Sequence, residues 1–323
     1  MKPSITDRIL NRGRRFWWKK MALVVKHMAS TGKGTAECLE IGCLPMSVHF
    51  YSPIPDIRDL ESRKIWEKKS QLPGIDFRPE KQLALLEQLG HEFGSECEWP
   101  LDSPPVSMEF YLKNNSFSYG CAAALHTMIR HFKPRHFIEI GSGHSSKVIS
   151  KALEMNTHDD PSHAPEYVII DPYPNEMVST QLSSVSKLVK EKVECVDPKL
   201  FKTLGKNDIL FIDSGHTVRT GGDVNFLFLE VLPRLQRGVI VHFHDINMPY
   251  EYSKAYFTNP QFRMFWTEAY LLQAFLICNR AFEVLLAMNY LQTDHMDSFC
   301  SAFPRFNLAE NWANSGSFWI RRV

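Results

Sequence analysis

The sequence predicts an α/β fold in which a mostly parallel sheet is covered by helices on both faces. From residue 135 onward, short apolar runs alternate with segments of helical periodicity. These runs are almost continuously apolar, which is typical of parallel strands that are buried on both faces. Five of the runs end at glycine, aspartate or histidine residues, and the carboxyl ends of such strands are where these folds bind ligands.

Seven apolar runs are predicted to be strands. They are residues 136–140, 167–170, 192–196, 208–212, 239–243, 282–286 and 316–322. Helices are predicted between strands over 145–154 and 224–235, and a long helix over 262–279 precedes the last two strands. These last two runs are expected to pair and close the sheet.

Residues 1–109 are predicted to form a helical and loop extension that caps the substrate, and residues 110–323 to form the sheet domain. Residues 45–79 are rich in proline and glycine, which indicates an extended loop. A helix is predicted after Pro79, because Leu83, Leu86 and Leu89 recur at a spacing of three. A second helix is predicted over residues 121–131.

The composition is that of a soluble globular protein. Of 323 residues, 44% are apolar and 23% are charged, and no apolar stretch is long enough for a transmembrane helix. The N-terminus lacks the pattern of a secretory signal. Seven cysteines are scattered without a CxxC pair, which argues against a disulfide framework or a structural zinc site and favours a cytoplasmic location.

The charge is distributed unevenly, although the net charge is only +1. Residues 1–20 contain seven Lys and Arg residues against one Asp, together with Phe16, Trp17 and Trp18. Basic residues with aromatic neighbours predict peripheral contact with an anionic membrane. We favour the alternative, a solvated helix that packs its aromatic residues on the body of the protein. Nucleic acid is not an expected partner, because the positive charge is confined to one end.

A glycine-containing turn follows the first predicted strand. Gly141 and Gly143 let the backbone approach a ligand, and the helix that follows offers free N–H groups. A dinucleotide fingerprint would have its third glycine at position 146, where Ser146 stands. Glu139 would repel a pyrophosphate but suits a positively charged cofactor. Asp171, which ends the next strand, is placed to bind a ribose diol.

Together with "LFIDSGHT" (210–217) and "DVNFLFLEVLPRLQRGVIVHFHDI" (223–246), this turn resembles the class I S-adenosylmethionine-dependent methyltransferases. The nearer resemblance is to a bacterial subgroup with an Ile-Asp-x-x-His motif after strand four and a His-Asp motif after strand five. Members of this subgroup are often associated with surface-glycan synthesis. The resemblance covers residues 110–323, and more loosely "HFYSPIPD" (49–56), and it implies a Rossmann-like fold. Ser145 departs from the pattern, because many members have a third glycine there.

The resemblance also implies roles for the residues that end the strands. The cofactor S-adenosyl-L-methionine would be bound by Glu139, Gly141, Ser142, Gly143, Asp171 and Asp197, with Asp171 on the ribose and Asp197 on the adenine side. Asp213 lies where the family places a residue that faces the sulfonium or the substrate.

Methyl transfer to oxygen requires that the acceptor hydroxyl lose its proton. His216 and His244 are candidate general bases, because an imidazole titrates near neutral pH. Asp213 and Asp245 are alternatively candidate ligands of Mg²⁺, which prefers oxygen donors, or they orient the two histidines. We favour a histidine base, with His216 ahead of His244.

The leading hypothesis is therefore an O-methyltransferase that acts on a sugar, a glycan in polysaccharide biosynthesis, or another small molecule. The alternatives are an NAD-dependent oxidoreductase on a Rossmann-like fold, an enzyme similar to the cephalosporin hydroxylases, and a non-catalytic binding protein. The expected partners are the acceptor and, as a homo-oligomer, further copies of the chain.

Overall fold

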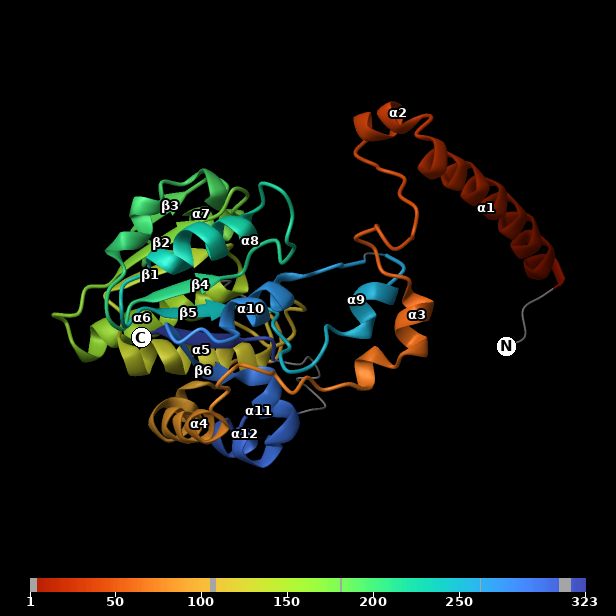
Figure 1. The fold of residues 1–323 in the computed structure, drawn as a ribbon. Coiled ribbons are helices and arrows are strands. Elements are labelled where there is room, and N and C mark those ends of the chain that lie inside the picture. Colours follow the sequence, from red (N-terminus) through yellow and green to blue (C-terminus); the bar gives the residue numbers. More distant parts are fainter. Residues whose placement is uncertain (1–4, 105–108, 181, 262, 308–314) are drawn as a thin grey trace. The chain divides into compact units, whose positions relative to one another are not determined.

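The computed structural model describes residues 5–104, 109–180, 182–261, 263–307 and 315–323, with side chains described from residue 15 onward. Within these residues it contains the predicted seven-stranded sheet, in the order β3-β2-β1-β4-β5-β7-β6 (Figure 1). Strands β1 to β5 pair in parallel, whereas β7 is antiparallel to both of its neighbours. The strands are β1 His136–Ile140, β2 Glu166–Ile170, β3 Lys187–Val189, β4 Ile209–Ile212, β5 Ile240–Phe243, β6 Phe282–Ala287 and β7 Phe318–Arg322. This is the predicted Rossmann-like α/β fold.

Helices precede the sheet in the sequence and connect its strands. The helices are α1 Ile5–Thr31, α2 Thr35–Glu40, α3 Ile57–Ser62, α4 Pro79–Phe93, α5 Tyr119–Phe132, α6 His144–Asp159, α7 Glu176–Thr180, α8 Asp223–Phe226, α9 Lys254–Thr258, α10 Glu268–Leu276, α11 Met288–Asp294 and α12 Met296–Ala302. A π-helical turn, Leu227–Val231, continues α8.

The sheet separates two apolar cores. Phe137 and Tyr167 point into a core shared with α4, α5 and α6. Their neighbours Ile138 and Val168 point to the other face, where Leu272 of α10 and the residues after α8 cover them. Because successive strand residues point to opposite faces, a continuously apolar strand fills both cores.

The chain divides into two compact units, Met1–Ile65 with Phe257–Phe265, and Trp66–Tyr256 with Trp266–Val323. The boundary expected between residues 109 and 110 lies inside the second unit. Helix α4 contacts α5, α12 and β6, and its Gln82 accepts a hydrogen bond from the backbone N–H of Ala287 in β6 at 2.8 Å. Residues 66–104 therefore belong with the sheet.

The strand expected at residues 192–196 is wrong. The third strand is Lys187–Val189, and Val193–Cys195 forms a 3₁₀ turn. The two valines of this segment, Val193 and Val196, are three residues apart, which is the repeat of a 3₁₀ helix. Val193 enters the core from this turn without pairing in the sheet.

The helix expected over 262–279 is shorter in the structure, where α10 runs from Glu268 to Leu276. Residue 262 lies outside the described residues. The loop expected over 45–79 contains the short helix α3 and a 3₁₀ turn at Ile65–Glu67. Short helices of this kind escape periodicity arguments, because they present only about one turn.

A buried ion-pair network ties α5 to its neighbours. The guanidinium of Arg130 donates to Glu96 at 2.8 Å and 3.1 Å, to Asp159 at 2.6 Å and to Asn156 at 2.6 Å. His126 contacts the same Glu96 carboxylate at 2.7 Å. Burial opposes the charge of Glu96, but the hydrogen bonds from His126 and Arg130 outweigh it, so the pKa of Glu96 is lowered.

We predict that Arg130→Met lowers the free energy of unfolding by about 3–5 kcal/mol, because it leaves the partly buried Glu96 carboxylate without its cation. Urea denaturation at pH 7 measures this. The double variant Arg130→Met/Glu96→Gln should recover part of the loss. Since the pKa of Glu96 is lowered in the folded state, its contribution is present above its unfolded pKa and is lost as the pH falls. A single variant within about 1 kcal/mol of the wild type would contradict the prediction.

Candidate active site

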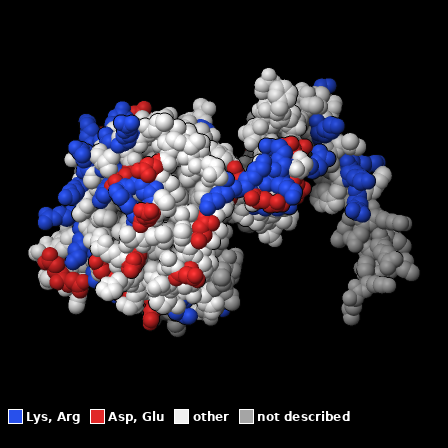
Figure 2. All heavy atoms as spheres, turned by 60° about the horizontal axis from the view of Figure 1, so that its bottom comes forward, with Lys and Arg blue, Asp and Glu red and all other residues white. Residues whose placement is uncertain are grey.

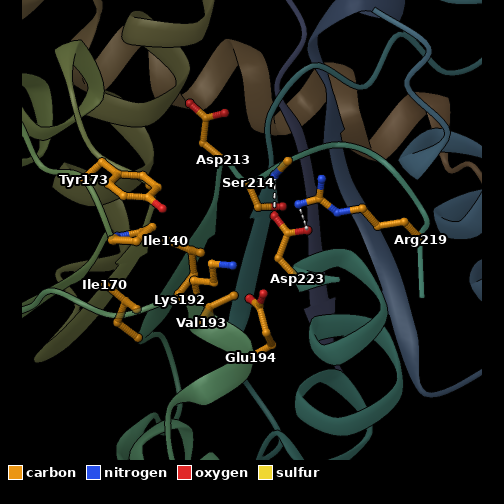
Figure 3. A pocket seen from close by; sticks show the side chains of 13 residues that line it. Ile140, Ile170, Tyr173, Lys192, Val193, Glu194, Asp213, Ser214, Arg219 and Asp223 are labelled. Atoms are coloured by element: carbon orange, nitrogen blue, oxygen red, sulfur yellow. Dashed lines mark hydrogen bonds and ion pairs between the residues drawn. The ribbon is translucent and has the colours of Figure 1, made fainter. Parts of the chain in front are cut away.

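A pocket opens at the point where the order of the strands reverses. The chain runs outward from β1 to β2 and β3 on one side, and from β4 to β5 on the other, so β1 and β4 flank the topological switch point. The pocket has a volume of about 230 Å³ (Figure 3). It is lined by Ile140, Gly141, Ile170, Pro172, Tyr173, Lys192, Val193, Glu194, Asp213, Ser214, Gly215, Arg219 and Asp223.

The turn after β1 lies against the end of β4. Gly141 has a left-handed backbone, with φ at +76°, and a Cβ atom there would lie 2.0 Å from the carbonyl oxygen of Asp213. The backbone N–H of Gly141 donates to Ile170, and that of Asp213 donates to Ile140. Glycine at position 141 is therefore required both by conformation and by space. This close approach forms one wall of the pocket.

Glu139 is enclosed behind the turn. It has no exposed surface, and the hydroxyls of Ser145, Ser146 and Tyr167 donate to its carboxylate. Burial raises the pKa of Glu139 to about 8, although these hydrogen bonds oppose the shift. Glu139 does not line the pocket; it ties the first turn of α6 to β1 and β2. Ser145, at the family's glycine position, is one of its donors.

Ser142 and Asp171 lie beside the pocket and pair with each other. The Ser142 hydroxyl donates to Asp171 Oδ2 at 2.5 Å, and the backbone N–H of Tyr173 donates to Asp171 Oδ1 at 2.7 Å. The half-buried Asp171 lies between the lining residues Ile170 and Pro172. Gly143 precedes α6, and a Cβ atom there would meet nothing within 4 Å.

Asp197 lies away from the pocket. Its exposed carboxylate accepts a hydrogen bond from the backbone N–H of Lys199 at 2.9 Å and caps a 3₁₀ turn. The sequence predicts only two of the lining residues, Gly141 and Asp213; Tyr173, Lys192 and Glu194 are among those that it does not predict. The third strand ends at Val189, so Lys192 and Glu194 lie in the turn after it and line the pocket. They are not predicted as site residues, because both fall in the strand expected over 192–196.

The structure brings together the four predicted residues at the ends of β4 and β5. His216 Nε2 lies 3.1 Å from Asp213 Oδ1 and 3.7 Å from Asp245 Oδ2. His244 Nδ1 lies 3.3 Å from Asp245 Oδ2 and 3.7 Å from Asp213 Oδ1. Both imidazoles are buried, whereas both carboxylates are partly exposed. Two carboxylates and two imidazoles thus share one edge of the sheet.

A fifth residue, Glu268, was not predicted. It is fully buried at the start of α10, and its Oε2 lies 2.8 Å from His216 Nδ1. The backbone N–H groups of Thr267 and Glu268 also donate to the carbonyl of His216. The first turn of α10 therefore fixes both the ring and the backbone of His216. Glu268 is the one acidic residue of the segment predicted as a helix over 262–279, and this alone does not distinguish a buried ionic partner from a solvated side chain.

Two of these residues have strained backbones. His216 has φ at +53° and Asp245 at +57°, in the left-handed region that residues other than glycine rarely adopt. Gly316 packs against Asp245 so closely that a Cβ atom would lie 2.8 Å from the Asp245 Cα. Strain of this kind persists where surrounding contacts hold it, and it is concentrated at functional sites.

The cluster is strongly polarised. Burial opposes ionisation of Asp213, but the charge of His244 and a hydrogen bond from His216 lower the pKa of Asp213 to about 2. Burial likewise opposes protonation of His216, but hydrogen bonds to Asp213 and Glu268 raise its pKa to about 10. Against the effect of burial, the charges of Asp245 and Asp213 raise the pKa of His244. The two carboxylates therefore attract positive charge.

Three of these residues could hold a divalent cation. Asp213, His216 and Asp245 each offer one ligand atom, and these atoms all lie within 4.8 Å of one another. Carboxylate oxygens suit Mg²⁺ and Mn²⁺, and imidazole is a common ligand of transition metals. In that arrangement Glu268 would orient the imidazole from its other nitrogen, as carboxylates do for metal-binding histidines.

Aromatic rings adjoin the cluster. The Trp266 ring lies 4.6 Å from the His216 ring, centroid to centroid, and Tyr256 lies 4.7 Å from Trp266. On the other side, the Phe117 ring stacks on His244 at 5.0 Å. The polar cluster is thus bordered by flat apolar surfaces.

Residues 138–246, from β1 to the turn after β5, match the family model described as a methyltransferase domain. The chain is also 31% identical over 185 residues to an uncharacterized protein of Archaeoglobus fulgidus; the match covers 55% of this chain and 81% of the relative. The chain therefore contains a methyltransferase domain and belongs to one family with this relative. No solved structure matches the chain. The methyltransferase domain favours methyl transfer over the oxidoreductase and hydroxylase alternatives.

We predict that in the metal-free methyltransferase His216 titrates near pH 10, and that Glu268→Gln lowers its pKa by about 1–3 units because one carboxylate is lost. Histidine-detected NMR titration in EDTA measures this, with the exposed Glu230→Gln as the control variant. A raised pKa stabilises the fold below the unfolded pKa, and this contribution is lost as the pH rises toward 10. Titration of His216 near 6.5 in the wild type would contradict the prediction.

Proposed function

We propose that the chain is an S-adenosylmethionine-dependent O-methyltransferase that acts on a hydroxyl of a sugar, a glycan or another small molecule. One observation carries this proposal: Asp213 belongs both to the pocket at the switch point and to the cluster of acids and imidazoles. A methyl donor in the pocket would therefore adjoin a hydroxyl at the cluster. Transfer to oxygen needs this arrangement, because donor and acceptor must be held in line while the proton leaves.

The pocket supports the cofactor assignment through its chemistry. In Figure 3, Asp213 and Tyr173 lie near the top of the pocket, with Lys192 and Glu194 below them. The carboxylate of Asp213 suits a cationic sulfonium, since opposite charges attract most strongly where water is scarce. We assign the amino-acid end of the cofactor to Gly141, Ser142 and Gly143, as the resemblance implies.

We assign the ribose hydroxyls to Asp171 and the adenine side to Glu194, which lines the pocket in place of Asp197. A ribose hydroxyl that displaced the Ser142 hydroxyl would find the Asp171 carboxylate already oriented by the backbone of Tyr173. Glu139 acts on the same turn from behind, as a positioning residue that holds Ser145 and Ser146.

The cluster supports proton removal from the acceptor. We propose that Asp213 and Asp245 hold a divalent cation, Mg²⁺ or Mn²⁺, and that His216, oriented by Glu268, takes the proton of the hydroxyl. When bound, such a cation lowers the pKa of a hydroxyl that contacts it. It also offsets the negative charge that keeps His216 protonated, so a neutral imidazole becomes available as a base. His244 is the second imidazole within reach of both carboxylates.

The aromatic border supports a ring-shaped acceptor. Trp266 and Tyr256 are partly exposed, and Trp266 lies directly beside His216. The faces of such rings pack against the apolar face of a sugar or against another aromatic ring. A hydroxyl on that ring would then point toward the polar cluster.

We predict that S-adenosylhomocysteine binds the wild type and that Asp171→Ala weakens this binding about 10–100-fold, because a charge-assisted hydrogen bond contributes roughly 1.5–3 kcal/mol. Isothermal titration calorimetry measures the affinity. Asp197→Ala is the matched control, since its exposed carboxylate caps a turn outside the pocket. Unchanged affinity in a folded Asp171→Ala variant would refute the ribose assignment, and binding of NAD but not of the adenosyl ligand would refute the function.

We predict that His216→Ala lowers turnover by about 10²–10⁴-fold with little change in cofactor affinity, as expected for loss of a general base. Transfer of radiolabelled methyl groups to a panel of sugars and phenols identifies an acceptor for this assay. EDTA and Asp245→Asn should each abolish turnover, and Asp245→Asn should also abolish Mn²⁺ binding measured by electron paramagnetic resonance. Asp297→Asn, which changes an exposed carboxylate of α12, is the control for both.

Full turnover in EDTA would show that the reaction needs no divalent cation. Full turnover in His216→Ala would show that His216 is not the general base. Equal Mn²⁺ binding by Asp245→Asn and Asp297→Asn would place the cation elsewhere.

A further inference from the structure

Helix α1 exposes its apolar residues. From residue 15 to 27 every side chain of the helix is exposed, and the fractions are 66% for Trp17, 66% for Trp18 and 54% for Met21. Large apolar side chains that are exposed next to one another mark an interaction surface. We propose that α1 docks on the surface of an anionic lipid membrane, an inference that does not depend on the proposed function.

Most of the large apolar side chains described in α1 gather on one side of the helix, whereas Phe16 and Leu23 lie outside it. Residues 17, 21, 24 and 28 recur at spacings of four, three and four, so they form a stripe along the helix. The cations at 15, 19 and 26 recur at four and seven and lie on the opposite side. The stripe comprises Trp17, Met21, Val24 and Met28, flanked by Trp18 and Val25 on one side and by Lys20 on the other, and the cations opposite it are Arg15, Lys19 and Lys26.

The width of the apolar face favours a membrane over a second copy of the helix. Two paired helices bury only a narrow apolar stripe on each helix. Trp18 and Val25 make the apolar face of α1 wider than such a stripe. Tryptophan prefers the boundary between headgroups and acyl chains, and Lys and Arg attract anionic lipids. Figure 2 shows blue Lys and Arg side chains next to white surface on the N-terminal part of the chain, at the right.

The helix is suited to lie on a membrane and not to cross it. Among the described residues, no helix is both long and apolar enough to cross a bilayer. The Lys20 amine lies 4.6 Å from the centroid of the Phe16 ring, so cations border the aromatic residues along the helix. An amphipathic helix with a basic polar face and tryptophans on the other face lies in the plane of the interface.

The segment after α1 adds apolar residues to the same unit. A Cβ atom at Gly34 would lie 2.8 Å from Met28 Cε, so the turn between α1 and α2 packs against the end of the apolar stripe. Beyond α2, large apolar side chains are again exposed, up to 88% for Phe50. The most exposed are Ile41, Phe50 and Tyr51. The apolar surface of this unit is therefore not confined to α1.

The test is flotation of the full-length chain with vesicles of phosphatidylcholine alone or with about one third phosphatidylglycerol, which supplies the anionic surface. We expect at least tenfold more protein to float with the anionic vesicles, and less as salt is raised, because salt screens the cations. Trp17→Ser/Met21→Ser should reduce flotation at least tenfold. Phe16→Ser/Leu23→Ser, the matched control, removes apolar side chains from outside the stripe and should change it less than threefold.

Each variant is also examined by analytical ultracentrifugation and by thermal unfolding. Equal flotation of the wild type with both vesicle types, or equal losses in the two double variants, would overturn the proposal. A wild-type dimer that Trp17→Ser/Met21→Ser dissociates, with no flotation of either form, would show that the stripe is a seam between two copies and would also overturn it.

Discussion

The close approach of the turn after β1 to the end of β4 is the constraint on which both halves of the site depend. Gly141 leaves no room for a side chain beside the Asp213 carbonyl, and backbone hydrogen bonds join the two strand ends. The same contact that shapes the pocket also fixes the backbone position from which the Asp213 side chain extends. The pocket and the polar cluster are therefore adjacent, because this backbone contact holds the ends of β1 and β4 together.

Charge balance is the second constraint. Asp213 and Asp245 face two buried imidazoles, and Glu268 reaches His216 from behind. A carboxylate in a region of low polarity needs a positive partner, which is either a proton on an imidazole or a bound cation. The proposed chemistry uses this competition: positive charge supplied by a cation leaves an imidazole free to accept the proton of a hydroxyl.

Much of the fold and part of the site follow from local patterns in the sequence. The parallel strands were predictable because each is a short apolar run, and their ends necessarily meet at one edge of the sheet. The same logic predicts that Asp213, His216, His244 and Asp245 lie together, as the structure shows. The third strand was misplaced because the valines at 193 and 196 pack against the core from a 3₁₀ turn and not from a strand.

Glu268 could not be predicted, because its role arises from a long-range contact. It is 52 residues from His216 in the chain, and nothing in the local pattern of α10 distinguishes a buried ionic partner from a solvated glutamate. The burial of Glu139 escaped prediction similarly, since the hydroxyl of Tyr167 comes from the neighbouring strand. Pairings across strands depend on register, which local periodicity does not specify.

The most direct test of the central claim is a crystal structure of the chain with S-adenosylhomocysteine and Mn²⁺. The account predicts the cofactor sulfur in the pocket beside Asp213 and an anomalous manganese peak in contact with Asp213 and Asp245, leaving space for a hydroxyl between the two and near His216. A cofactor bound away from Asp213, or a sulfur that faces away from His216 and His244, would contradict it.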